Sequence, residues 1–247
     1  MRLKFRSALR THSGSVRAVN EDSALARDDA ALWLVADGMG GHAHGDWASQ
    51  TVAAQMAAVD MSVPAAERGP AIMAALKAGN AAIVDASARA GAQMGTTAVV
   101  LHLEGHDLLC LWVGDSRAYR FRRGGLSQIT RDHSVVQELI DRGTLTPGEA
   151  ELHPMAHVLS RAVGTEADLR ADAFSDTAQP GDAYLLCTDG LTKVVPEDVI
   201  ARLLRLPSVN AAADRLVAET LARGAPDNVT VIVVSVEEVT EVMRAGV

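Results

Sequence analysis

The chain has 247 residues, of which 48% are hydrophobic, and its formal net charge at pH 7 is -8. This length and composition suit one large domain with a substantial core. The acidic balance, without any basic block, argues against nucleic acid or an anionic membrane as a partner. No run approaches the roughly 20 apolar residues that cross a bilayer, and the basic N-terminus lacks the apolar stretch of a secretion signal. We therefore expect a soluble, cytoplasmic protein.

The first predicted elements are one strand and two helices. The apolar run ALWLVA (31–36) is short and bounded by turn residues, which predicts a buried strand. Apolar or small residues then recur every three or four positions in 47–59 and 70–90, which predicts two helices that each bury one face. Pro70 is placed to begin the second helix. The stripes are Ala48, Val52, Met56 and Val59 in the first helix and Ile72, Leu76, Gly79 and Ile83 in the second.

A series of consecutive strands follows. We expect strands at 97–103, 107–114 and 117–121, and a hairpin at 121–129 with Gly124 and Gly125 at its turn. Connections this short predict antiparallel sheets, with helices covering the sheet faces, instead of a repeated strand–helix alternation.

The stretch 131–165 interrupts this pattern. It is polar, carries one short helix and has turn signals at 146–148 and 153–154, which predicts an excursion that forms a mobile flap. The chain then returns to a strand at 183–188, a helix at 208–223 and a strand at 229–236, with Gly224 ending the helix. We expect a single domain over residues 1–240, with the flap as a small subdomain and 241–247 as a C-terminal tail.

The two cysteines, Cys110 and Cys187, lie inside apolar runs. They indicate small core residues in a reducing compartment, with a disulfide as the minor alternative.

Acidic residues stand where several apolar runs begin or end. Any one of them is explained as a turn residue, because Asp-Gly is a common turn pair. Together they would repel one another at a sheet edge, and a multivalent cation would remove that cost. They are Asp37 after 31–36, Asp115 after 107–114, Asp189 after 183–188, Asp227 before 229–236, and the adjacent Glu21 and Asp22 in NED.

The ligand chemistry of this set is all oxygen, which favours Mg²⁺ or Mn²⁺. Gly38, directly after Asp37, would let a backbone carbonyl approach a bound ion. His42 and His44 have no second cluster to complete a zinc site, and we interpret them as loop or helix-start residues. Arg17, four residues before Glu21, could bind a phosphate group through its two-pronged donor face or form a surface salt bridge. Its spacing leaves both open.

Seven motifs in order now carry a resemblance to a known family. They are similar to the successive motifs of the metal-dependent serine/threonine protein phosphatases, the PPM or type 2C family, in its compact bacterial form. The resemblance runs from about Ser13 to Val236. The motifs are SVRAVNEDS, VADGMGGHAHGDWAS, MGTTAVV, LWVGDSRAYRFRRGGLSQITRDHS, HVLSRAVG, LLCTDGL and APDNVTVIVV.

The resemblance implies an α+β fold, a four-layer αββα sandwich with two central antiparallel β-sheets flanked by helices on both faces. It also implies hydrolysis of phosphoserine and phosphothreonine by a hydroxide that bridges two Mn²⁺ or Mg²⁺ ions. The implied roles are Asp37 as the bridging ligand, Gly38 as a carbonyl ligand, Asp189 and Asp227 on the first ion, Glu21 on the second, Asp22 on metal-bound water, Asp115 with Asp189 at a third ion, and Arg17 as the phosphate clamp.

The partners implied are phosphorylated proteins, with a cognate serine/threonine kinase that this enzyme would oppose; some relatives act in control of type VI secretion. We expect a monomer and no nucleic-acid or membrane partner. The flap would touch the protein substrate.

One position departs from the family pattern. Many eukaryotic members have a histidine, a proposed general acid, directly after the Asp-Gly pair, and here that residue is Met39. Many bacterial relatives also lack the histidine, so protonation of the leaving group stays unassigned. Two alternatives remain: a catalytically silent member that binds phosphoproteins, and an ATP-binding module of the histidine-kinase type suggested by DGMGG.

Overall fold

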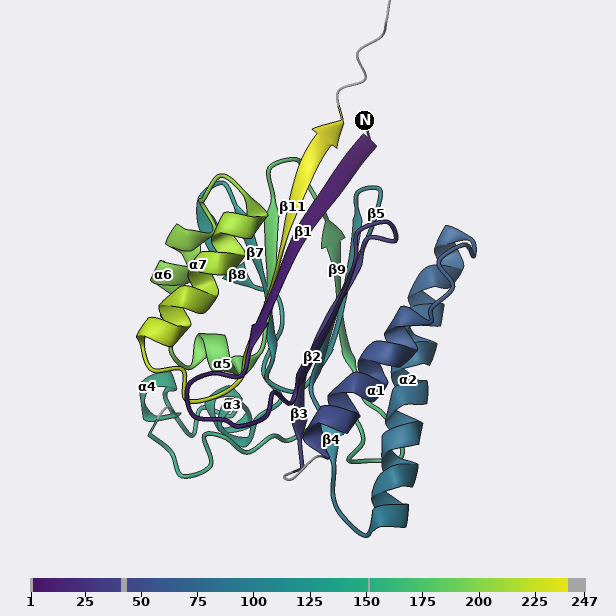
Figure 1. Cartoon of the computed structure of the whole chain (residues 1–247), viewed down its shortest axis with the longest axis vertical. Helices are drawn as coiled ribbons and strands as arrows, with labels where there is room; N and C mark the ends of the chain where they lie inside the picture. Colours follow the sequence, from purple (N-terminus) through teal and green to yellow (C-terminus); the bar gives the residue numbers. More distant parts are fainter. Residues whose placement is uncertain (1, 41–43, 151, 240–247) are drawn as a thin grey trace, which may run out of the picture.

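The computed structural model of the protein describes residues 2–40, 44–150 and 152–239. Two antiparallel sheets face each other and helices cover both outer faces, so the molecule has four layers, as predicted (Figure 1). The strand orders are β1-β11-β10-β7-β8 and β2-β3-β5-β6-β9, with the short β4 paired to the end of β3. The tail 241–247 and His42 lie outside the described residues.

The strands are β1 Arg2–His12, β2 Asp22–Arg27, β3 Leu32–Met39, β4 Gly95–Thr96, β5 Ala98–Glu104, β6 Asp107–Val113, β7 Arg117–Arg122, β8 Gly125–Gln128, β9 Asp172–Thr177, β10 Ala183–Cys187 and β11 Val229–Val239. The helices are α1 Gly45–Ala57, α2 Ala65–Ala90, α3 Val135–Asp141, α4 Pro147–Ala150, α5 Asp189–Thr192, α6 Glu197–Leu203 and α7 Val209–Ala222. No helix within the described ranges combines the length and the apolar composition needed to cross a membrane.

Apolar side chains fill the three spaces between the four layers. Trp33, Tyr184 and Ile232 belong to the cluster between the sheets. A second cluster joins α6 and α7 to the sheet that contains β11, and a third joins α1 and α2 to the sheet that contains β3. The predicted stripes of the first two helices are buried in this third cluster or, for Gly79, against Val52 of α1. This packing fixes the sheet edges that carry the acidic residues.

Two predicted boundaries were wrong. The helix α2 begins at Ala65, after Pro64, so that Pro70 lies inside it. The additional first residues are mostly exposed and therefore carry no apolar stripe that the sequence could reveal. In the β7–β8 hairpin Arg122 pairs with Gly125, so the turn residues are Arg123 and Gly124, with φ of 51° and 85°. Positive φ at both central residues is typical of a type I′ turn.

The sequence analysis did not predict the strands β1, β2, β4 and β9. In β1, Phe5 and Leu9 pack toward the space between the sheets, while the alternate positions hold the charged Lys4, Arg6 and Arg10 and the buried Ala8. The strand nevertheless pairs with β11 from Arg2 to His12, so the two ends of the described chain run side by side (Figure 1). A strand with one buried face needs an apolar residue only at every second position, which makes its signal weak.

The segment 131–165 contains α3 and α4 and lies at the same end of the sandwich as α5 (Figure 1). Backbone hydrogen bonds hold both of its ends: His133 N donates to Gly114 O at 2.9 Å, and Val163 N donates to Thr96 O at 2.8 Å. The segment is thereby attached beside the turn that carries Asp115.

Candidate active site

The structure brings together aspartates from five separate segments. Asp22 and Asp37 are direct partners across the β2–β3 ladder. Asp115 lies in the turn between β6 and β7, Asp189 begins α5 directly after β10, and Asp227 precedes β11. The two sheets therefore deliver these side chains to a common end of the sandwich.

Burial and neighbouring carboxylates raise the pKa of three of these aspartates. Burial, and then the charges of Asp189, Asp22, Asp115 and Asp227, raise the pKa of Asp37 well above its ordinary value. Burial is also the main cause that raises the pKa of Asp22 and of Asp115, each to about 7, and the charge of Asp189 adds to both. Without a compensating cation, this arrangement resists full ionisation.

Gly38 lies where the end of β3 meets the start of α1. A Cβ atom on Gly38 would lie 2.0 Å from the carbonyl oxygen of Gly45 and 2.7 Å from that of Glu21. Gly38 N also donates to Glu21 O at 3.2 Å. Only glycine fits this close approach, which keeps Glu21, Asp37 and the beginning of α1 in contact.

Arg17 is on the exposed loop 13–21 and pairs with Asp227. Its Nε lies 2.9 Å from Oδ1 of Asp227, and its Nη2 lies 2.9 Å from Oδ2. The sequence left open whether Arg17 binds phosphate or forms a surface salt bridge. The structure shows a salt bridge, with Asp227 as the partner. The charges of Glu21 and Asp37 also raise the pKa of Arg17, after the larger effect of Asp227, so the guanidinium faces the acidic cluster.

Asn228 anchors the loop that carries Arg17 and Glu21, and the sequence analysis did not single it out. Its Nδ2 donates to Ser13 O and to Val19 O, both at 2.9 Å, and its Oδ1 accepts from Glu21 N at 2.8 Å. The loop could not have been connected to this residue from the sequence, because its partners are more than 200 positions away.

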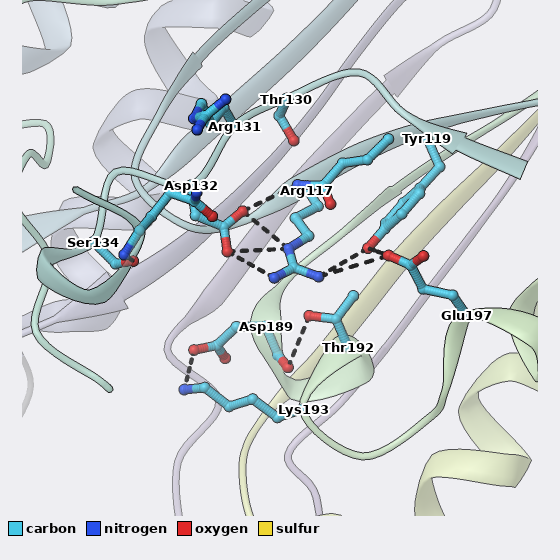
Figure 2. A network of polar contacts seen from close by, with 12 residues as sticks. Arg117, Tyr119, Thr130, Arg131, Asp132, Ser134, Asp189, Thr192, Lys193 and Glu197 are labelled. Carbon is cyan, nitrogen blue, oxygen red and sulfur yellow. Dashed lines mark hydrogen bonds and ion pairs between the residues drawn. The ribbon is translucent and has the colours of Figure 1, made fainter. Parts of the chain in front are cut away.

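Lys193 is a second residue that the sequence analysis missed. It follows α5, and its ammonium forms an ion pair with Asp189 (Figure 2). The signal was present in DGLTK, because residues four apart on a helical turn are neighbours.

Arg117 connects the site to the segment 131–165 (Figure 2). It donates to both carboxylate oxygens of Asp132, with Nη2 2.7 Å from Oδ2, and to the Tyr119 hydroxyl at 3.0 Å. That hydroxyl donates to Glu197 of α6 at 3.1 Å. A bidentate arginine of this kind holds its partner in a defined orientation. Asp132, at the start of the segment, is therefore fixed to Arg117, the first residue of β7, which follows Asp115 by two positions.

The oxygen atoms of the acidic residues are suitable ligands for a divalent cation. Oδ1 of Asp22 and Oδ1 of Asp189 are buried without a hydrogen-bond partner. Within the described residues no three acidic, histidine or cysteine side chains converge tightly enough to enclose an ion, since Asp189 is turned to Lys193 and Asp227 to Arg17. Unpartnered carboxylate oxygens and mutual repulsion are nevertheless what a hard cation would relieve, so the residues fit Mg²⁺ or Mn²⁺.

The remaining predicted positions lie at the border of this site. His44 directly precedes α1 and its side chain caps no backbone group there. Met39 lines a groove of about 580 Å³ that is also lined by His157, Val158 and Arg161. The groove therefore joins the end of β3 to the segment 131–165.

Comparison with known proteins assigns the family. The sequence model of the family "Protein phosphatase 2C" matches residues 4–139. The chain is 42% identical over 239 residues to the serine/threonine protein phosphatase PstP of Mycobacterium tuberculosis, an alignment that covers 95% of this chain and 45% of PstP. The chain thus spans less than half the length of that relative. It belongs to the protein phosphatase 2C family, which confirms the resemblance seen in its motifs.

Solved structures of relatives share the fold. The catalytic domain of PstP in complex with two manganese ions superposes with a TM-score of 0.87 at 41% identity, covering 96% of this chain and 100% of that one. PppA, described as a key regulatory component of T6SS in Pseudomonas aeruginosa, gives a TM-score of 0.88 at 39% identity, covering 94% and 98%. The name of PstP gives no support to an ATP-binding module or to a silent member.

Proposed function

We propose that this protein is a metal-dependent serine/threonine protein phosphatase that hydrolyses phosphoserine and phosphothreonine in other proteins. The observation that carries the proposal is the convergence of aspartates from five segments: burial and the neighbouring carboxylates raise the pKa of Asp37, and Asp22 and Asp189 each have a buried oxygen without a hydrogen-bond partner. Membership of the protein phosphatase 2C family supports the same activity.

Two Mn²⁺ or Mg²⁺ ions would be held by the acidic cluster. Asp37 and the Gly38 carbonyl, with Asp189 and Asp227 on one side and Glu21 on the other, would supply the ligands, and Asp22 would lie beside them. When bound, such ions lower the pKa of water and neutralise phosphoryl oxygens. The two manganese ions in the PstP complex support this choice of metal.

The protein's own residues would position the phosphate. Arg17 is half-exposed on its loop, so it can exchange the Asp227 carboxylate for the phosphate of the substrate, which offers the same bidentate geometry. Asn228 fixes the loop so that the guanidinium keeps its direction. The Met39 side chain has no proton to donate, and the leaving oxygen would take its proton from water.

The protein substrate would lie across the groove beside Met39. Part of its lining is the stretch 157–162 of the segment 131–165, and Leu152, Met155 and Val158 of that segment are exposed apolar residues. We assign 131–165 as the substrate-facing flap of a single phosphatase domain over residues 1–240. A cognate serine/threonine kinase and its substrates are the partners that this activity implies, and the similarity to PppA supports a regulatory role.

We place this activity in a monomer in the cytoplasm. The two buried free cysteines, Cys110 and Cys187, support a reducing compartment.

The test is hydrolysis of a phosphothreonine peptide by the purified chain with Mn²⁺, with Mg²⁺ or with a chelator. We expect turnover only with a divalent cation, and a loss of more than about 100-fold in Asp37→Asn, since even outer partners of metal ligands are worth roughly 10–100-fold. Asp214→Asn, which changes an exposed aspartate of α7, is the matched control. Full activity in Asp37→Asn, or turnover that survives chelation, would refute the proposal. A nucleotide titration on the same sample tests the ATP-binding alternative.

A further inference from the structure

Lys193 places a positive charge inside the acidic cluster. The α5 turn begins at Asp189, and Lys193 N donates to Asp189 O at 2.9 Å, so the backbone turns through one helical turn between the two residues. The side chain of Lys193 then folds back, and its ammonium pairs with Oδ2 of Asp189 (Figure 2). The Asp189 side chain is only 12% exposed and that of Lys193 35% exposed, so this pair is shielded more than an ordinary surface pair.

The charge of Lys193 acts on more than one carboxylate. Burial lowers its pKa, but Asp189, Asp115 and Asp37 outweigh this effect and raise it. In return, Lys193 lowers the pKa of Asp115, which burial and Asp189 raise. Lys193 thus compensates charge on Asp115 as well as on Asp189, its partner in the ion pair.

The second cation of the site pairs with a different aspartate. Arg17 pairs with Asp227, and its other acidic neighbours are Glu21 and Asp37. The two cationic side chains thus pair with two different aspartates of the cluster, and the charge of Asp37 raises the pKa of both. They differ in exposure, since the Arg17 side chain is 52% exposed against 35% for Lys193.

The two oxygens of Asp189 have different surroundings. Oδ2 is held by Lys193, whereas Oδ1 is buried and has no hydrogen-bond partner. A carboxylate held through one oxygen has its other oxygen oriented for a further ligand, and such outer partners control how a metal ligand is presented. Lys193 can therefore orient Asp189 and neutralise it at the same time.

We propose that Lys193 is a tethered cation that, through its ion pair with Asp189, takes the place of the third metal ion that the family resemblance assigns to Asp115 and Asp189. This inference rests on the proposed function, because it concerns the ions that the phosphatase binds. A divalent ion that approached Asp115 would have to displace the ammonium or lie close to a like charge, and the tethered charge loses no translational freedom when it binds. The chain then holds ions only on the side of Asp37, Asp227 and Glu21, with Lys193 as a positioning residue for Asp189.

The test counts bound ions. The unmodified chain, Lys193→Met and Lys193→Arg are dialysed to equilibrium against millimolar Mn²⁺, and the metal and the protein are quantified. We expect two ions per chain in the unmodified protein and in Lys193→Arg, which keeps the charge, and three in Lys193→Met, which keeps a side chain of similar length without it. Without metal, Lys193→Met should melt at a lower temperature than the unmodified chain, and Mn²⁺ should raise its melting temperature by the larger amount.

Three ions in the unmodified chain, or only two in folded Lys193→Met, would overturn the assignment. If Lys193→Met does not fold, Asp115→Asn in the unmodified background decides: an unchanged count of two supports the proposal, and the loss of one ion overturns it. A chain that hydrolyses the phosphopeptide and binds three ions refutes the role of Lys193 alone. A chain that neither binds Mn²⁺ nor hydrolyses the peptide refutes the proposed function and this inference with it.

Discussion

Replacing Asn228 by alanine should loosen the loop that carries Arg17 and Glu21. The side chain is 5% exposed, and its amide makes two hydrogen bonds of 2.9 Å to Ser13 O and Val19 O and one of 2.8 Å from Glu21 N. At roughly 1 kcal/mol for each bond, the variant should lose about 3 kcal/mol of unfolding free energy. The freed loop should also misplace Arg17, which we expect to lower kcat/KM by about 10-fold or more, since small displacements can cost roughly 100-fold.

Urea unfolding followed by circular dichroism measures the free energy of unfolding, and hydrolysis of a phosphothreonine peptide with Mn²⁺ measures kcat/KM. The control is Asn210→Ala, because Asn210 is an exposed asparagine of α7 whose side chain accepts one hydrogen bond of 3.2 Å from Arg10. It should change stability by less than about 0.5 kcal/mol and leave kcat/KM unchanged. If Asn228→Ala behaves like this control in both assays, the role assigned to Asn228 is wrong.

Three further predictions concern stability. Arg122→Met should lower the free energy of unfolding in urea by about 3–5 kcal/mol, because it removes the cation that pairs with the buried Asp182. The side chain of Asp182 is 1% exposed and accepts guanidinium bonds of 2.7 Å; a loss below about 1 kcal/mol would contradict this. Burial lowers the pKa of His102 below its usual 6.5. As the pH drops below 6.5, this histidine is therefore protonated in the unfolded chain before it is protonated in the folded one, and the free energy of unfolding should fall. His102→Gln should reduce this fall by up to about 1.4 kcal/mol per pH unit, and an unchanged slope between pH 7 and 5 would argue against a buried neutral imidazole. Ser208→Ala should remove the cap bond from Ala211 N to Ser208 Oγ, 3.1 Å long, and cost about 1 kcal/mol or roughly 2–4 °C in Tm, whereas Ser208→Asp should not.

The sequence was sufficient for the elements with strong periodic signals. The runs around Trp33, Leu185 and Val233 are apolar on both faces because each sheet is covered by a helical layer and by the other sheet, and such strands show in the sequence as continuous runs. The stripe from Ala48 to Val59 was correct because a helix on a sheet buries one face only. In β1 the inward-facing Phe5 and Leu9 alternate mostly with charged residues. In β9 only Phe174 packs against the core, with Asp172 and Asp176 two positions away on the same face, so the same rules did not find these strands.

For the site, residue type and order were enough to name the aspartates and Arg17 as candidates. What faces each carboxylate was a matter of tertiary structure. Arg17 and Asp227 are 210 positions apart, and they meet because β1 pairs with β11 and the loop after β1 folds over the turn before β11.

By itself, then, the sequence determined the family motifs, the types of the main elements and the all-oxygen character of the site, because these depend on local pattern and side-chain chemistry. Only the tertiary structure decided that Arg17 pairs with Asp227, that Asn228 holds the Arg17 loop, and that Gly38 must lack a side chain beside Gly45. The reason is that charge compensation and close approach depend on distances between distant segments, and those distances exist only once the two sheets have paired and packed.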